Sequence, residues 1–360
     1  MTGTETTDHP LGPPPPVIPP PPSGPPPVER PEWHRVARAA AIGLYAGALV
    51  AVWWMWGIPL DREQILLWVA GGLVVLTVGS PGGGPVRVVR DWLPVVLVLI
   101  LYDLTRGKAD ELGIQPHLDP QLAFDRWIGL GELPTLRLQH ALYGPGPVRW
   151  WEIPVTFTYI SHFFVPFAVA AVFWVRDRAR YWRYVRRFVT LSFAAALTFV
   201  LYPAIPPWMA ARFGEVDPIV RTAPRGWGHR WIHLDIAQDV IRAGWDTANL
   251  VAAVPSLHAG YTALVAVMLW PAARPAARAL LALYVIAMGF VLVLSGEHYV
   301  FDVLVGWAYV AVVCLVWNRL ERHPVPFWRR SLKIGAGSPA AHAPAGAAPR
   351  ADCVRRSGSC

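Results

Sequence analysis

The sequence predicts an all-α fold, a polytopic transmembrane helical bundle of about eight spans with disordered termini. Three observations predict it. Of the 360 residues, 54% are apolar and only 16% are charged, and the mean hydropathy is +0.36. Long apolar runs alternate with short arginine-rich segments. Both ends of the chain are instead rich in Pro, Ala and Gly. A soluble domain seldom has this composition, so we expect a membrane protein.

The two ends are predicted to be disordered cytoplasmic tails. Residues 1–32 include "PLGPPPPVIPPPPSGPPP", which favours a solvated polyproline-like chain and lacks the layout of a cleavable signal peptide. Residues 331–360 are rich in Ala, Pro and Gly. The transmembrane domain is therefore expected at 33–330, with its catalytic core at about 102–318.

Eight apolar runs are candidate spans, because a helix of about 20 apolar residues crosses a bilayer and shorter ones can do so inside a bundle. The third and the sixth are short for a full span. In order the runs are Ala39–Ile58, Ile65–Gly79, Trp92–Leu104, Ile153–Val175, Phe188–Tyr202, Ala259–Trp270, Ala279–Ser295 and Val300–Trp317.

The arginines predict the orientation, since Lys and Arg near span ends stay on the cytoplasmic side. The strongest signal is "RDRARYWRYVRR", Arg176–Arg187, between the fourth and fifth runs. With strict alternation every other cytoplasmic segment is also basic. We therefore expect both termini in the cytoplasm of a multi-pass cell-membrane protein. The segments from about Thr105 to Trp150 and from Pro203 to His258, and the link holding His298, are expected outside.

The net charge and the cysteine content bear on which partners and ligands to expect. The net charge of +8 comes mostly from arginines in the short loops, so the topology accounts for it and nucleic-acid binding is not expected. The three cysteines show neither metal-ligand spacing nor a framework of pairs. We expect neither a metal nor a cofactor.

Two polar motifs lie at the expected outer ends of spans. Ser256 and His258, in "VPSLHAGY", lie at the start of the sixth run, where a helix N-terminus favours an anion such as phosphate. His298, in "SGEHYVFD", follows the seventh run. Asp302 lies four residues after His298 and can orient the imidazole of that histidine.

This set of groups suits phosphoryl transfer. One imidazole can attack phosphorus and form a phosphohistidine, while the other protonates the departing oxygen and later deprotonates the acceptor. Either histidine alone could be an interfacial residue, and the His-x-x-x-Asp pair could be a helix-stabilising contact or half of a metal site. The convergence of both motifs on one membrane face favours catalysis.

These motifs resemble those of the type 2 phosphatidic acid phosphatase superfamily, whose members share Pro-Ser-Gly-His and a later His-x-x-x-Asp. The match here is "PSLH" and "HYVFD". "YDLTRG" (Tyr102–Gly107) and "LYPAIPPW" (Leu201–Trp208) extend the likeness towards the inositol phosphorylceramide synthase branch. The resemblance implies that His298 is the nucleophile, Asp302 its orienting partner, His258 the general acid and base, and Ser256 a phosphate-binding residue.

The chain departs from the phosphatase members of that superfamily. It lacks their Lys-x6-Arg-Pro motif, Leu292 replaces their arginine six residues before the second histidine, and Leu257 replaces their glycine. Other arginines must then bind the phosphate. The candidates that we favour are Arg106, Arg221 and Arg225, although each could equally contact a lipid head group or set the topology.

Two further residues are candidates for lining the cleft. His162 lies within the fourth run, where a polar side chain is costly unless it faces the bundle; an interhelical hydrogen bond is the alternative. Tyr202 belongs to "LYPAIPPW".

The leading hypothesis is an integral-membrane phosphotransferase that moves a phosphorylated head group, for example phosphoinositol, to or from a membrane lipid or a polyol acceptor. The first alternative is a lipid phosphate or prenyl-pyrophosphate phosphatase, in which water resolves the intermediate. The second is a transporter or scaffold without chemistry, which the lack of internal repeats disfavours.

Overall fold

The computed structural model describes residues 32–56, 62–78, 84–104, 112–143, 149–221 and 249–322. The two expected tails lie outside the described residues, apart from Glu32. Within the described ranges the fold is all-α, as predicted, with only isolated bridges that join His117 to Ala204 and Ala204 to Ala252. The helices are α1 (Glu32–Trp56), α2 (Arg62–Leu76), α3 (Gly84–Leu104), α5 (Asp119–Ile128), α6 (Pro134–Leu142), α7 (Glu152–Arg176), α8 (Arg178–Leu201), α9 (Pro207–Arg212), α11 (Leu257–Leu269), the 3-10 turn η1 (Trp270–Ala272), α12 (Pro275–Leu294) and α13 (Val300–Arg322).

Each of the eight predicted apolar runs overlaps a helix, in order α1, α2, α3, α7, α8, α11, α12 and α13. The ends of the first two runs, Ile58 and Gly79, lie outside the described residues. Among the described residues, five helices are long and apolar enough to cross a membrane, which confirms a multi-pass membrane protein; they are Val36–Trp56, Glu152–Arg176, Arg178–Leu201, Pro275–Leu294 and Val300–Arg322. Two others, α2 and α11, are shorter, and α3 carries Arg87, Arg90 and Asp91 in its first half. The count of eight spans stays a prediction.

The arginine-rich segment between the fourth and fifth runs is helical rather than a loop. The side chain of Asp177 accepts a hydrogen bond from the backbone N–H of Arg180 at 2.9 Å and caps α8, which begins at Arg178. Helix α8 therefore starts ten residues before the predicted run, and its first turns carry the arginines.

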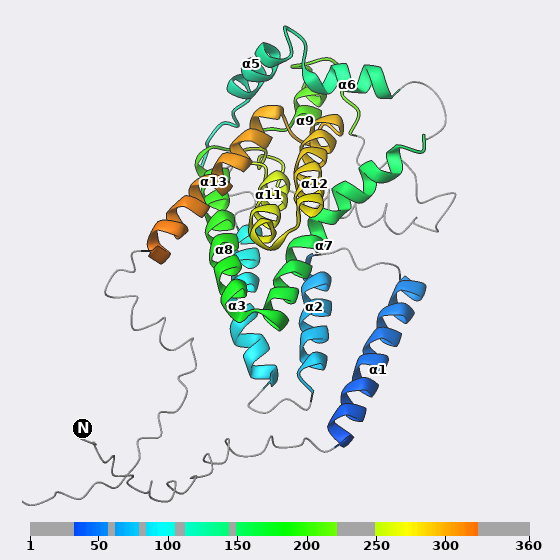
Figure 1. Cartoon of the computed structure of the whole chain (residues 1–360). Helices are drawn as coiled ribbons and strands as arrows, with labels where there is room; N and C mark the ends of the chain where they lie inside the picture. Colours follow the sequence, from blue (N-terminus) through cyan, green and yellow to red (C-terminus); the bar gives the residue numbers. More distant parts are fainter. Residues whose placement is uncertain are drawn as a thin grey trace, which may run out of the picture.

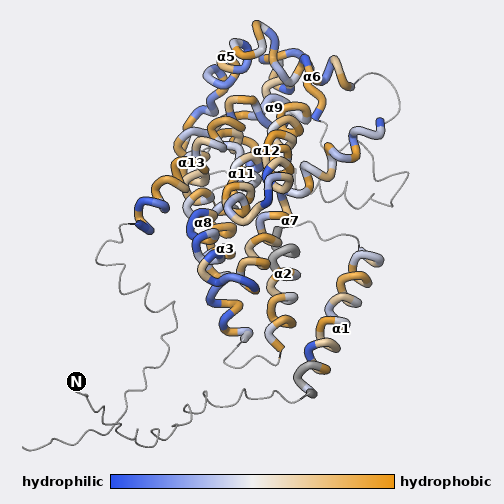
Figure 2. Tube along the Cα trace, viewed as in Figure 1, coloured by the Kyte–Doolittle hydropathy of each residue, from blue (hydrophilic) through white to orange (hydrophobic). Residues whose placement is uncertain are grey.

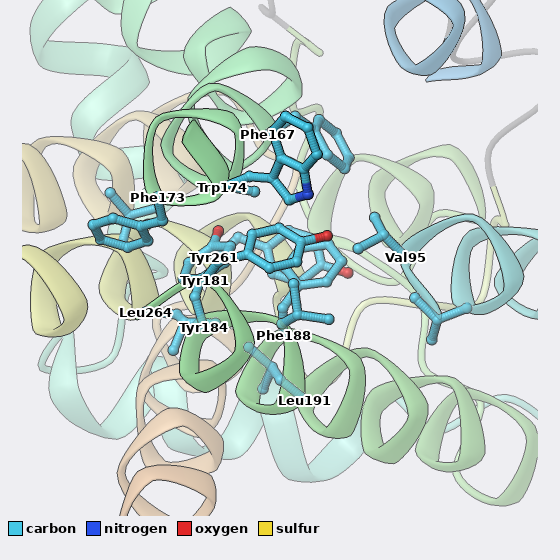
Figure 3. Packing of buried hydrophobic residues seen from close by; sticks show 14 of the residues in the cluster. Val95, Phe167, Phe173, Trp174, Tyr181, Tyr184, Phe188, Leu191, Tyr261 and Leu264 are labelled. Atoms are coloured by element: carbon cyan, nitrogen blue, oxygen red, sulfur yellow. The ribbon is translucent and has the colours of Figure 1, made fainter. Parts of the chain in front are cut away.

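The core lies where α7, α8 and α11 pack together (Figure 1). Figure 3 shows its rings: Phe188 stacks on Tyr261 with centroids 4.6 Å apart, and Phe167 meets Phe188 edge-on at 6.0 Å. The buried hydroxyls are paired, because Tyr261 and Ser192 share a hydrogen bond of 2.7 Å and Tyr184 donates to the carbonyl of Pro166 at 3.1 Å. The bundle thus buries aromatic area without leaving these polar atoms unsatisfied.

The bundle has two different ends. At one end, which we call the basic end, Arg187 in the first half of α8 forms an ion pair with Glu321 at the end of α13, with N and O 2.9 Å apart. At the opposite end, which we call the site end, the short helices α5, α6 and α9 lie over the bundle (Figure 1). Figure 2 shows hydrophobic residues along α1, α2 and α12 and hydrophilic ones around α5. The sequence did not predict α5, α6 and α9, because each has only a few turns and lies in a segment that was expected to be a loop.

The basic end depends on a buried carboxylate. Asp91 of α3 is fully buried and accepts hydrogen bonds from Trp174 Nε1, at 2.9 Å, and from the guanidinium of Arg178. The hydroxyl of Tyr181 donates to the backbone carbonyl of Asp91 at 2.7 Å. This one residue therefore joins α3 to α7 and α8.

Replacing Asp91 with alanine is expected to destabilise the fold by roughly 2–4 kcal/mol, because Trp174 Nε1 and Arg178 lose their buried acceptor. The measurement is thermal unfolding of the purified protein in detergent. Asp91→Asn is the control and should lose less, because its amide oxygen still accepts a hydrogen bond. An unchanged unfolding temperature for Asp91→Ala would contradict this account of the basic end.

Candidate active site

Three segments meet at the site end: the start of α11, the start of α13, and the turn 295–299 that follows α12. Gly296 in this turn has φ of 71°, a left-handed conformation that glycine adopts without cost. This lets the N–H groups of Glu297 and His298 bond back to the carbonyl of Leu292 at 3.1 and 3.3 Å. The end of α12 is thereby capped, and the backbone of His298 is fixed.

The two histidines and the aspartate form a continuous line of polar contacts. His298 Nδ1 lies 3.3 Å from Asp302 Oδ2, and His298 Nε2 lies 3.4 Å from His258 Nδ1. Asp302 Oδ2 also accepts the backbone N–H of Tyr299 at 2.9 Å. His298 and Asp302 are buried, with 6% and 0% of their surface exposed. The structure thus brings together the three residues predicted to be catalytic.

This geometry has a chemical consequence. A carboxylate at Nδ1 favours the tautomer in which Nδ1 carries the proton, so that Nε2 presents its lone pair. That lone pair points at the second imidazole, and apo sites often show such contacts longer than in the reacting complex. The arrangement suits a nucleophile with an orienting acid on one side and a proton-transfer partner on the other.

The two motifs meet through a close backbone contact. The N–H of Ser256 donates to the carbonyl of Asp302 at 3.1 Å. A Cβ atom on Gly306 of α13 would lie only 2.5 Å from the carbonyl oxygen of Ser256, so glycine is required for this approach. The hydroxyl of Ser256 accepts the N–H of Ala259 at 3.3 Å and caps α11. Its role in binding phosphate stays a prediction.

His162 reaches the site from α7. The centroids of the His162 and His258 rings lie 4.0 Å apart. Tyr159 stacks on the ring of His258, with centroids 5.5 Å apart and an interplanar angle of 23°. Tyr261 stacks near His162 at 5.7 Å. The candidate cleft residue is therefore in contact with the predicted general acid and base.

Of the three candidate phosphate-binding arginines, the structure describes only Arg221. Arg221 forms a two-point ion pair with Glu297, Nε–Oε1 2.7 Å and NH2–Oε2 3.0 Å, and lies over the ring of Trp208 at 4.3 Å. It therefore contacts the residue directly before His298. Arg106 and Arg225 lie outside the described residues.

Tyr202, the other candidate cleft residue, is at the end of α8 and stacks on His117 with centroids 4.1 Å apart and rings 6° from parallel. Tyr202 also packs against the buried cluster of Ala204, Ala253 and Val254, which Phe301 contacts as well.

Two residues that the sequence did not reveal hold the site in place. Gln139 of α6 exchanges hydrogen bonds with the backbone of Val220, at 2.8 and 3.0 Å, and donates to the carbonyl of Leu294 at 2.8 Å. It thereby fixes the segment of Arg221 against the end of α12. Asp125 of α5 accepts the N–H groups of Val300 and Phe301 at 2.9 and 3.0 Å. Neither residue belongs to a recognisable motif, and only the folded chain brings them here.

Comparison with known proteins agrees with the position of the site. A family model described as the PAP2 superfamily matches residues 122–316, which are more than half of the chain and include all of the described candidate residues. The phosphoinositol dihydroceramide synthase of Bacteroides thetaiotaomicron is 26% identical over 170 residues, which are 44% of this chain and 54% of that protein. The chain thus matches about half the length of this relative. No solved structure matches.

Proposed function

Because the chain belongs to the PAP2 superfamily and is one of its membrane enzymes, we propose that it transfers a phosphorylated head group to or from a lipid through a phosphohistidine on His298. The observation that carries the proposal is the line of contacts from Asp302 to His298 to His258, at 3.3 and 3.4 Å. A scaffold or transporter does not need a buried carboxylate to orient an imidazole towards a second one.

The reaction has two balanced steps. In the first, His298 Nε2 attacks phosphorus, the bond to the leaving oxygen breaks, and His258 gives that oxygen a proton. In the second, His258 takes the proton of an acceptor hydroxyl, the acceptor oxygen attacks phosphorus, and the bond from phosphorus to nitrogen breaks. Asp302 stabilises the positive charge that forms on the imidazole of His298 in the first step.

We propose phosphoinositol as the head group and a lipid alcohol as the acceptor. The name of the Bacteroides relative includes both phosphoinositol and the lipid dihydroceramide. The site also supports a departure from phosphatase chemistry, because Leu292 is fully buried beside Met288 and Val303 and leaves no cation at that position. Arg221 instead forms an ion pair with Glu297, the residue directly before His298.

We propose that the site faces away from the cytoplasm. The basic end carries Arg178 and Arg187 of α8 together with Arg322 of α13, whereas His258 and His298 lie towards the opposite end. Basic residues near span ends stay in the cytoplasm, which supports cytoplasmic termini and an outer-leaflet substrate.

A reporter fused after Arg330 tests this topology. If the reporter is an enzyme that is active only outside the cytoplasm, the fusion should give no signal, because we expect the C-terminus in the cytoplasm. A signal would contradict the outward-facing site.

Product analysis tests the transferase function. The protein in lipid vesicles receives phosphatidylinositol labelled at phosphorus, with or without ceramide. We expect the label to move to ceramide, because the phosphohistidine is resolved by an alcohol. If the label appears only as water-soluble phosphate or inositol phosphate whatever alcohol is added, the protein is a hydrolase. A second arm with labelled phosphatidic acid then detects the phosphatase alternative as free phosphate.

A further inference from the structure

Helix α5 contributes a fully buried carboxylate to the start of α13. Asp125 Oδ2 accepts the N–H of Val300 at 2.9 Å, and Oδ1 accepts that of Phe301 at 3.0 Å. Asp125 has no exposed surface. The two segments are 175 residues apart in the chain, so this is a tertiary contact rather than a local cap.

The first N–H groups of a helix have no partner within it and must be satisfied from outside. Here two carboxylates share them: Asp302 Oδ2 accepts the N–H of Tyr299, and Asp125 accepts the next two. The same Asp302 oxygen also contacts His298 Nδ1 at 3.3 Å. If Asp125 no longer accepted the N–H groups of Val300 and Phe301, the carboxylate of Asp302 would move towards them and away from the imidazole of His298.

We propose that Asp125 is a positioning residue: from α5 it caps α13 and thereby keeps Asp302 on His298. The packing of α5 supports this, because Phe124 meets Phe301 edge-on at 5.5 Å and Leu122 packs in the same cluster as Tyr299. These apolar contacts hold the carboxylate against the helix start. The inference rests on the proposed function, in which Asp302 must orient His298.

The protonation of Asp125 falls in an accessible pH range. Burial raises the pKa of Asp125 to about 6, and the charge of Asp302 adds to the rise, whereas the two backbone N–H groups lower it. The other titratable or charged groups nearby are Tyr299 and His298 before α13, Arg126 on α5, and the pair of Glu132 and Arg137 at the turn to α6. At neutral pH the carboxylate is ionised and both oxygens accept. Below about pH 6 one oxygen carries a proton and the cap weakens.

The test compares the wild type with Asp125→Asn over pH 5 to 8, and measures kcat and KM with labelled phosphatidylinositol and ceramide. Asparagine has one acceptor oxygen and resembles the protonated acid. We expect Asp125→Asn to lower kcat about tenfold at pH 7.5, as the loss of a helix cap would, with KM little changed. The ratio of the two rates should fall towards one below pH 5.5.

The control is Asp119→Asn, an exposed carboxylate in the first turn of the same helix. Its rate ratio to the wild type should stay near one at every pH. If the ratio for Asp125→Asn is instead the same at all pH values, the residue merely supports folding and the inference is wrong.

Thermal unfolding tests Asp125 without any turnover. A folded-state pKa near 6, above the ordinary value of 3.8, means that protonation stabilises the folded protein as the pH falls from about 6.5 towards 4. The unfolding temperature of the wild type, relative to that of Asp125→Asn, should therefore rise between pH 7 and pH 5. A constant difference overturns the inference, even if lipid transfer is found. The expected rise, combined with no transfer to any acceptor, supports the cap and overturns the proposed function.

Discussion

Replacing His298 with alanine is expected to reduce head-group transfer by roughly 10⁴-fold or more, because the variant has no atom that can attack phosphorus. The imidazole is buried and contacts Asp302 and His258. The measurement is transfer of label from phosphatidylinositol to ceramide in vesicles.

His140→Ala is the matched control, since His140 lies on α6 at the site end and its side chain is 72% exposed. It should keep the wild-type rate. A near-normal rate for His298→Ala would show that another group is the nucleophile.

The roles of the two histidines can be separated with an activated substrate. A p-nitrophenyl ester of phosphoinositol needs little protonation of its leaving group. It should restore the first step in His258→Ala, seen as a burst of p-nitrophenol, but not in His298→Ala. If both variants fail equally with this ester, His258 is more than a proton-transfer group.

Replacing Gly306 with alanine is expected to lower the transfer rate about a hundredfold and to lower the stability of the fold. The added Cβ would lie 2.5 Å from the carbonyl oxygen of Ser256, which is backbone and cannot rotate away. Helices α11 and α13 must then separate, and the hydrogen bond from Ser256 N to the carbonyl of Asp302 is lost. Such overpacking typically costs about 1–3 kcal/mol, and a shift of 1 Å between reacting groups can cost about a hundredfold in rate.

Gly260→Ala is the control for this substitution. Gly260 is also helical and lies at the same crossing, but its added Cβ would meet the side chain of Leu191 at 3.5 Å, an ordinary contact. It should fold and turn over normally, since alanine also favours a helix. The measurements are thermal unfolding and transfer rate. Wild-type activity in Gly306→Ala would contradict the close approach of the two motifs.

The all-α fold and the multi-pass character could be predicted because each apolar run needs an internally hydrogen-bonded helix in a membrane. The helix boundaries could not be predicted from hydropathy. Helix α8 begins at Arg178 because Asp177 caps it, and hydropathy does not report caps. Helices α5, α6 and α9 are too short and too polar to stand out by hydropathy, so the loops that carry them gave no signal.

The candidate site divides in the same way. His258, His298 and Asp302 could be found from two short motifs, and their proximity followed from topology. Asp125 and Gln139 could not be found, because each acts through a contact with a segment more than 80 residues away. The ion pair of Arg221 with Glu297 could not be predicted for the same reason: Glu297 adjoins His298 in the sequence, but Arg221 lies 76 residues earlier and reaches Glu297 only in the folded chain.

The most direct test of the proposed phosphohistidine is to isolate it. His258→Ala is mixed with the p-nitrophenyl ester of phosphoinositol labelled at phosphorus, and the reaction is quenched with alkali, in which phosphohistidine survives. The intermediate should accumulate, because its formation no longer needs an acid and its resolution still needs a base. Peptide mapping should place the label on His298. A label on any other residue, or a burst of p-nitrophenol without bound label, would contradict the proposed mechanism.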